Sequence, residues 1–193
     1  MTNTPVQTPL QLQVQPQLHL DTFADFETFL AQPEAAERNF EWIDGEVIEK
    51  MPSNPYSSHI VQRILFELMK YLVDHPIGVV TGEAGGYRVD GQVLVPDSAL
   101  TRSKLVHTGF QTDPPDLTIE VISPTDKSED VRRKLQKYMN AGVTVWVVHP
   151  REKTVDIWSP DQPVQTKGLE DVVTFPALLP GFSIAVRRIV ADS

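Results

Sequence analysis

The chain has 193 residues, of which 40% are hydrophobic and 22% charged, values that suit one soluble globular domain rather than two. It contains no cysteine, which excludes disulfides, zinc–thiolate sites, iron–sulfur clusters and thiol nucleophiles. Its formal net charge of −9 excludes binding to nucleic acid through overall basic charge. Any activity on nucleic acid would therefore need a local basic surface, a bound metal or a second subunit.

Residues 1–20 are rich in Gln, Pro and Thr, a composition that cannot bury enough apolar surface to fold alone. We expect a flexible leader there, although the alternating residues 10–15 leave an edge strand open. Residues 21–193 are expected to form a single domain. The chain shows no apolar run long enough to span a bilayer and no secretion signal, so we expect a cytoplasmic protein with no membrane partner.

The first predicted elements are a helix, a hairpin and a second helix. Asp21 is a plausible N-cap for a helix with an apolar face from Phe23 to Leu30. Two β-prone runs meet at an Asp-Gly pair within residues 40–50, which predicts a β-hairpin. A long helix then follows Ser57 and Ser58 and is closed by Pro76 and Gly78. Its predicted buried residues are Ile60, Ile64, Leu65, Leu68, Met69 and Leu72.

The rest of the chain alternates strands with one further helix. A strand, a charged helix and a second strand in succession favour a right-handed crossover within a partly parallel sheet. The predicted fold class is α/β (an α+β mixed sheet): a central mixed β-sheet flanked by helices, with an N-terminal helix and β-hairpin. The predicted strands are 78–83, 86–90, 93–100, 116–123, 143–149, 153–158 and 183–188, and the helix is 126–141.

Glu120 is the acidic residue that most requires a special explanation. It lies in a near-continuous apolar run, Leu117–Ile122, of the type that is buried on both faces of a sheet. Glutamate is rarely buried without a partner, and Ile122 shares its face of the strand, so a solvated position is disfavoured. We therefore interpret Glu120 as a paired or metal-binding carboxylate.

Two Pro-Asp pairs supply further carboxylates. Asp97 follows Pro96 in an apolar run, where its burial would be costly without a cation or donors. A local turn in which Asp97 caps backbone N–H groups is the better explanation when this residue is taken alone. Asp116 follows Pro115 and would lie on the same face of the strand as Glu120. Its position at the start of the strand suits a residue that caps the backbone.

Three more residues are candidates with ordinary alternatives. Lys134 lies four residues after Asp130 on the charged helix, so a surface ion pair is the default, while the same helix face could point at the carboxylates. Glu46 directly follows the hairpin turn, where an exposed acid is unremarkable. His59 opens the long helix, where it could meet a phosphate, bind metal or simply stack on a neighbour.

Taken together, these residues resemble the Uma2 family, restriction-endonuclease-like proteins abundant in cyanobacteria. The resemblance covers roughly residues 20–190 and rests on the order and spacing of several short motifs. His149 stands where the family usually has an Asp. The matching segments are Ile43–Glu46, His59, Val95–Asp97, Pro115–Pro124, Lys134–Tyr138, Ala141–Val143 and Trp146–Pro150.

The resemblance implies a restriction endonuclease-like core with a PD-(D/E)xK-type site. Asp97 and Glu120 would be metal carboxylates, Val121 would offer its backbone carbonyl, and Glu46 and His59 would lie at the site. The superfamily motif expects lysine two residues after the glutamate, where this chain has Ile122. The resemblance implies that a lysine on the following helix, Lys134, takes its place.

The expected function is then a metal-dependent endonuclease that hydrolyses phosphodiester bonds in DNA. Mg²⁺ accepts oxygen ligands from two carboxylates and a carbonyl, and Mn²⁺ should substitute for it. A homodimer is a reasonable expectation, because cutting both strands usually calls for two sites. The alternative is a catalytically inactive nuclease-like fold that binds proteins or nucleic acid, which the acidic balance and the missing in-motif lysine favour. RNA as the substrate also stays open.

Overall fold

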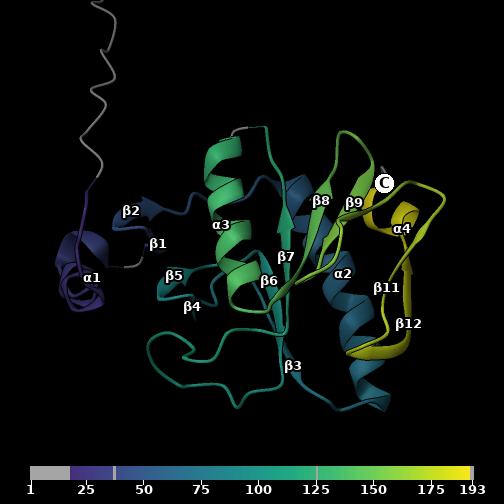
Figure 1. Cartoon of the computed structure of the whole chain (residues 1–193), viewed down its shortest axis with the longest axis horizontal. Coiled ribbons are helices and arrows are strands. Elements are labelled where there is room, and N and C mark those ends of the chain that lie inside the picture. The colour runs from purple at the N-terminus through teal and green to yellow at the C-terminus, as the bar shows by residue number, and fades with distance from the viewer. Residues whose placement is uncertain (1–17, 37, 125, 192–193) are drawn as a thin grey trace, which may run out of the picture.

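The structure, a computed structural model, describes residues 18–36, 38–124 and 126–191. At its centre is a six-stranded mixed sheet in the order β10-β9-β8-β7-β6-β3 (Figure 1). Only β7 and β8 are parallel, and α3 (Ser128–Asn140) connects them, which confirms the predicted strand–helix–strand unit. The strands of this sheet are β3 (Val79–Thr81), β6 (Ser98–Thr101), β7 (Leu117–Val121), β8 (Thr144–His149), β9 (Thr154–Trp158) and β10 (Gln165–Lys167).

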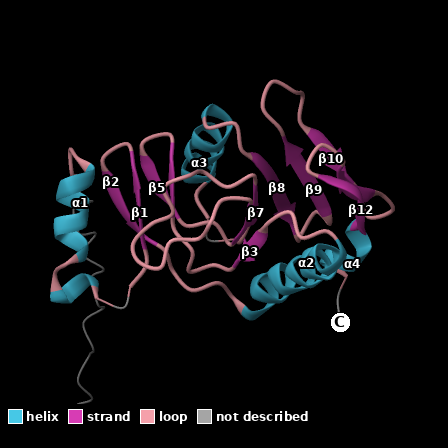
Figure 2. Cartoon of the chain, turned by 90° about the horizontal axis from the view of Figure 1, so that it is seen from below, coloured by secondary structure: helices cyan, strands magenta, loops and turns pink. Residues whose placement is uncertain are grey.

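Helices cover both faces of this sheet, as the sequence predicts. Figure 2 shows α3 on one side of the strands and α2 (Pro55–Asp74) on the other. The short helix α4 (Val186–Val190) and the two-stranded sheet of β11 (Val172–Phe175) and β12 (Leu179–Ala185) join α2 on its side. The expected mixed sheet flanked by helices is therefore confirmed.

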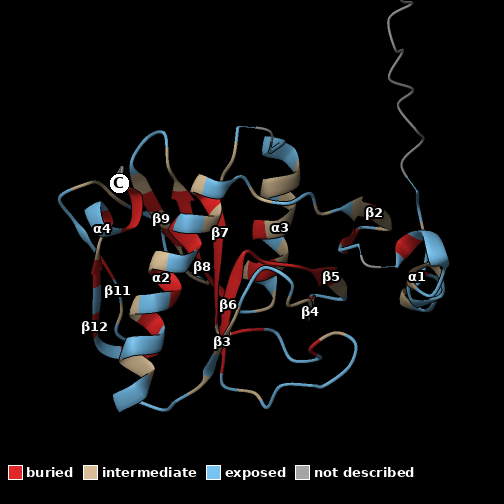
Figure 3. Cartoon of the chain, turned by 180° about the vertical axis from the view of Figure 1, so that it is seen from behind, coloured by how far each residue is buried: buried red, intermediate tan, exposed pale blue. Residues whose placement is uncertain are grey.

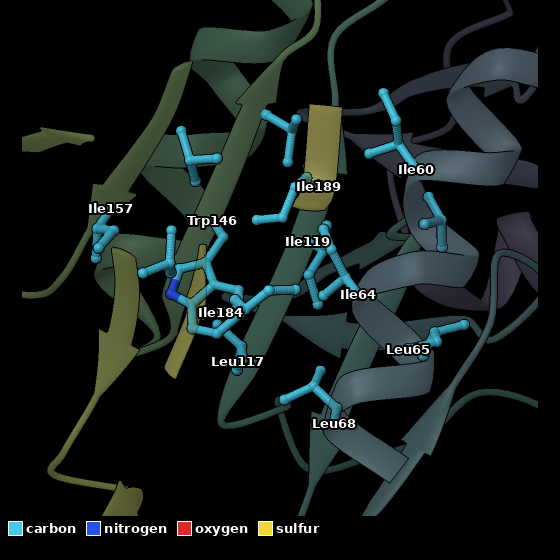
Figure 4. Packing of buried hydrophobic residues seen from close by; sticks show 14 of the residues in the cluster. Ile60, Ile64, Leu65, Leu68, Leu117, Ile119, Trp146, Ile157, Ile184 and Ile189 are labelled. Atoms are coloured by element: carbon cyan, nitrogen blue, oxygen red, sulfur yellow. The ribbon is translucent and has the colours of Figure 1, made fainter. Parts of the chain in front are cut away.

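The largest core lies between the sheet and α2. Alternate residues of β7 and β8 point to this side, among them Ile119 and Trp146, and meet Ile64 and Leu68 of the helix (Figure 4). Figure 3 shows the same pattern as buried residues along β7 and β8 and on the inner side of α2. The opposite side of β7 and β8 faces α3, where Tyr138 is fully buried.

A second, four-stranded sheet in the order β2-β1-β5-β4 lies beside the first. The predicted hairpin is confirmed, and Asp44 and Gly45 at its turn have φ of 51° and 85°, as a tight two-residue turn requires. An aromatic cluster that includes Phe26 and Trp42 packs this sheet against α1. The elements are α1 (Phe23–Leu30), a 3₁₀ turn (Pro33–Ala35), β1 (Phe40–Ile43), β2 (Glu46–Glu49), β4 (Tyr87–Val89) and β5 (Gln92–Leu94).

Several predicted boundaries differ from the structure. The N-cap of α1 is Thr22 rather than Asp21, because Thr22 and Asp25 form a reciprocal capping box. Helix α2 begins at Pro55, four residues before the predicted start at His59, because Asn54 accepts the N–H of Ser57. Met69 was predicted to be buried and is 49% exposed.

The predicted strand 93–100 is in fact two strands in different sheets. Pro96 has no N–H for a strand ladder, and the chain leaves the four-stranded sheet after Leu94 and enters the six-stranded sheet at Ser98. Near the C-terminus, the predicted strand 183–188 is the end of β12 followed by α4, and β10 and β11 were missed.

The predicted flexible leader and its possible strand at residues 10–15 lie outside the described residues, except for residues 18–20. No helix in the described part of the chain is long and apolar enough to cross a membrane.

Candidate active site

Glu120 is buried in the middle of the central sheet. All five residues of β7 are buried between β6 and β8, and Ile119 and Val121 belong to the core on the α2 side. Because strand residues alternate, Glu120 faces the opposite side, toward α3. Burial raises the pKa of the Glu120 carboxyl, although the nearby Lys134 and Lys50 ammonium groups act in the opposite direction.

Lys134 and Tyr138, one turn apart on α3, both reach Glu120. The ammonium of Lys134 lies 3.0 and 3.1 Å from the two carboxylate oxygens of Glu120. The hydroxyl of Tyr138 donates to Oε1 of Glu120 at 3.0 Å. The predicted surface pair between Lys134 and Asp130 is therefore wrong, since Asp130 instead pairs with Arg133.

The environment holds the two α3 groups in fixed protonation states. Burial lowers the pKa of Lys134, but attraction to Glu120, Glu41 and Asp97 outweighs it and leaves the pKa above its ordinary value. Burial and the same carboxylates raise the pKa of Tyr138 well above its ordinary value. At neutral pH the site therefore holds a charged ammonium and a neutral phenol.

Asp97 lies where the chain passes from one sheet to the other. Its Oδ2 accepts the backbone N–H of Val121 at 2.8 Å, and its Oδ1 lies 2.9 Å from the ammonium of Lys50. The cap predicted for Asp97 is therefore present, but the N–H belongs to β7, 24 residues away, rather than to a local turn. This bond holds Asp97 beside the backbone that directly follows Glu120.

Glu41 and Lys50 of the hairpin complete the group of buried charges. Oε1 of Glu41 lies 2.9 Å from the ammonium of Lys134 and accepts the N–H of Val95, also at 2.9 Å. Lys50 donates to the carbonyl of Val95 at 2.5 Å. Both were missed from the sequence, although Glu41 lies in a strand of buried residues and carries the same signal as Glu120.

We call Glu41, Lys50, Asp97, Glu120, Lys134 and Tyr138 the charged cluster. Its three carboxylates and two ammonium groups leave a formal charge of −1. The charged side chains are only 7–16% exposed, so the cluster lies largely away from solvent.

The chemistry of the charged cluster suits a hard divalent cation. Asp97 and Glu120 offer carboxylate oxygens from neighbouring stretches of chain, and the backbone of Val121 touches Asp97. Within the described ranges, no group of three or more His, Asp or Glu side chains is already arranged around one metal position. The carboxylates instead face lysine ammonium groups.

The other predicted site residues lie elsewhere. Glu46 forms an ion pair with Arg133, at 2.6 Å. His59 is exposed on α2, on the other side of the sheet, beside a surface pocket of about 470 Å³. Asp116 binds Arg102 through the backbone N–H and the guanidinium, as expected of a residue at the start of a strand. The structure does not bring these three residues into the charged cluster, and catalytic roles for Glu46 and His59 stay predictions.

Positions 122 and 149, where the chain departs from the family pattern, have ordinary surroundings. Ile122 is partly buried against the core on the α3 side. His149, at the end of β8, pairs with Asp156 of β9 at 3.1 Å. The lysine that reaches Glu120 therefore comes from α3 and not from the strand itself.

Comparisons with known proteins identify the family and the fold of the chain. The family model of Uma2, described as "putative restriction endonuclease", matches residues 26–187. A crystal structure from Anabaena variabilis, described as a "putative nuclease belonging to DUF820", superposes with a TM-score of 0.73 at 22% identity. The match covers 86% of this chain and 96% of that one, and it shows a shared fold. The comparison with curated proteins found no match.

Proposed function

Since the chain belongs to the Uma2 family, we propose that it is a metal-dependent endonuclease that hydrolyses phosphodiester bonds in DNA. The single observation that carries this proposal is the charged cluster. Buried carboxylates and ammonium groups are costly to assemble, and such groups with raised pKa values gather preferentially at functional sites.

Asp97 and Glu120, with the carbonyl of Val121, would hold Mg²⁺ or Mn²⁺. The bound cation would lower the pKa of a water molecule and polarise the scissile phosphate. Asp97 would be kept in place by the N–H of Val121, and Glu120 by the hydroxyl of Tyr138. These fixed bonds orient both carboxylates before any ligand arrives.

Lys134 would act on the charge that develops during the reaction. Its raised pKa keeps the ammonium charged at neutral pH, and its position between Glu41 and Glu120 directs it into the cluster. From there it would orient the attacking water or stabilise the additional negative charge on the phosphate. Glu41 would then be a positioning residue for Lys134.

The test is nicking of supercoiled plasmid by the wild type and by Glu120→Gln in Mg²⁺ or Mn²⁺. We expect metal-dependent nicking that falls at least ~100-fold in Glu120→Gln, because the neutral amide lacks the negative charge with which a carboxylate holds a hard cation. Glu49→Gln is the matched control, since Glu49 pairs with the exposed Arg38 at the hairpin surface. Equal activity in Glu120→Gln and the wild type would contradict the proposal.

A non-catalytic role in binding protein or nucleic acid is the second candidate. It is favoured by the net charge of −9 and by the ammonium partners that the buried carboxylates already have. Under this alternative, the plasmid stays intact with the wild type and with Glu120→Gln at every metal concentration. An RNA substrate offered in the same assay separates DNA cleavage from cleavage of another phosphodiester.

A further inference from the structure

The two proposed metal carboxylates are each bound by a different lysine. Asp97 contacts the ammonium of Lys50, and Glu120 contacts that of Lys134. Resting on the proposed function, we infer that Lys50 is a built-in cation that occupies the metal-facing oxygen of Asp97 and must leave it when a divalent metal binds.

The bonds of Asp97 identify which of its oxygens is involved. Its Oδ2 is held by the N–H of Val121, a fixed part of the sheet. Its Oδ1 is held only by the Lys50 side chain among the bonds of the described residues. A cation that binds Asp97 without disturbing the backbone therefore approaches Oδ1, where Lys50 now lies.

Lys50 is also the less firmly held of the two lysines. Its ammonium has one carboxylate and one carbonyl as partners, Asp97 and Val95. The ammonium of Lys134 has two carboxylates, Glu41 and Glu120, and contacts both oxygens of Glu120. A divalent cation therefore displaces Lys50 before it displaces Lys134.

Charge balance favours replacement of the Lys50 ammonium by the divalent cation over binding of the cation beside an unmoved Lys50. The charged cluster already carries two ammonium groups against three carboxylates. A divalent cation placed at Asp97 beside an unmoved Lys50 would meet a like charge within a few ångströms, in a region with little water to screen it. Lys50 has a flexible four-carbon stem and can withdraw toward solvent.

Lys50 thus has two opposite effects. Without metal it neutralises Asp97 and stabilises the fold, and in the presence of metal it competes for the same oxygen. Removing the Lys50 ammonium should lower the stability of the metal-free protein and raise its affinity for the metal. A lysine with a merely structural role would produce the first effect without the second.

The experiment compares Lys50→Met with the wild type in the full chain. Mn²⁺ affinity is measured by isothermal titration calorimetry, and thermal unfolding is recorded in EDTA and in Mn²⁺. Lys137→Met is the matched control, because Lys137 is 17% exposed against 16% for Lys50 and pairs with Asp44 outside the cluster. Lys50→Gln, which can still donate to Val95, is the second variant in case Lys50→Met does not fold.

We expect Lys50→Met to bind Mn²⁺ at least tenfold more tightly than the wild type. Its unfolding temperature in EDTA should fall, and Mn²⁺ should raise it by more than it raises that of the wild type. The Mn²⁺ affinity of Lys137→Met should match the wild type within threefold. In the wild type, Mn²⁺ should also increase labelling of Lys50 by an amine-reactive reagent, while labelling of Lys137 stays constant.

Two results overturn the inference in distinguishable ways. Equal or weaker Mn²⁺ binding in the Lys50 variants, with Lys50 labelling unchanged by Mn²⁺, means that Lys50 does not compete, and the proposed nuclease survives. If the wild type and both Lys50 variants bind no Mn²⁺ at millimolar concentration, both the inference and the proposed metal site fail.

Discussion

Replacing Lys134 by methionine should be among the most destabilising single changes in this protein. Methionine keeps most of the length of the side chain but removes the ammonium that lies between Glu41 and Glu120. The three side chains are 13%, 7% and 12% exposed, so two carboxylates would be left buried without their cation. Breaking a buried ion pair on one side costs about 3–5 kcal/mol, a large part of a typical total stability of about 5–15 kcal/mol.

The measurement is urea unfolding at neutral pH, arranged as a double-mutant cycle with Glu120→Gln. The double variant removes both an ammonium and a carboxylate, so it should recover part of the loss seen in Lys134→Met. Recovery should be incomplete because Glu41 still lacks its partner. We expect a coupling energy of about 2 kcal/mol or more between the two positions.

The control lies on the same helix. Lys137 pairs with Asp44, whose side chain is 47% exposed, and such pairs are worth about 1 kcal/mol or less. Lys137→Met should therefore cost far less than Lys134→Met. The reasoning is refuted if Lys134→Met costs less than about 1 kcal/mol, or if the two changes in the cycle are simply additive.

Three further outcomes follow from the same structure. Glu46→Gln should change plasmid nicking less than threefold, because Glu46 is engaged in an ion pair with Arg133; a large loss would support its predicted catalytic role. Leu68→Ala should cost about 2–5 kcal/mol in urea unfolding, since Leu68 is fully buried, whereas Met69→Ala should cost little. Because the pKa of Tyr138 is raised in the folded protein, its contribution to the free energy of unfolding is fully present below about pH 10. That contribution is lost as the pH rises through the pKa that Tyr138 has in the folded state. Tyr138→Phe should therefore leave the tyrosinate absorbance of the folded protein near pH 10 unchanged.

The central unit of the fold could be predicted because its signals are local. A near-continuous apolar run predicts the buried strand β7, and a charged helix followed by Gly142 predicts the crossover to the next strand. Strand β10 was missed because it carries little apolar character, since it consists of Gln165, Thr166 and Lys167. Strand β11 (Val172–Phe175) is largely apolar and was missed although its residues favour a strand. Their pairing depends on neighbours that a single segment of sequence does not identify.

The candidate site was predicted in part for the same reason. Glu120 stands out because a carboxylate in an apolar strand needs a partner, and the structure supplies Lys134 and Tyr138. Glu41 carries a similar signal but was passed over, since a hairpin strand with one polar position usually faces water. Lys50 has no local signal, because its role arises only where the hairpin meets Asp97.

The charged cluster lies at the junction of the two sheets, and this position explains why it contains so many charges. Glu41 and Lys50 come from the hairpin, and Glu120 and Lys134 come from the central unit. The two parts meet where Glu41 pairs with Lys134. The N–H and the carbonyl of Val95 are bound by Glu41 and Lys50, which also pair with Lys134 and Asp97. The same bonds therefore join the two sheets and assemble the site, so a substitution that loosens the hairpin should also disturb the carboxylates. The proposed activity and the stability of the fold should therefore be coupled in this region, and separating them requires a measurement of metal binding beside every measurement of cleavage.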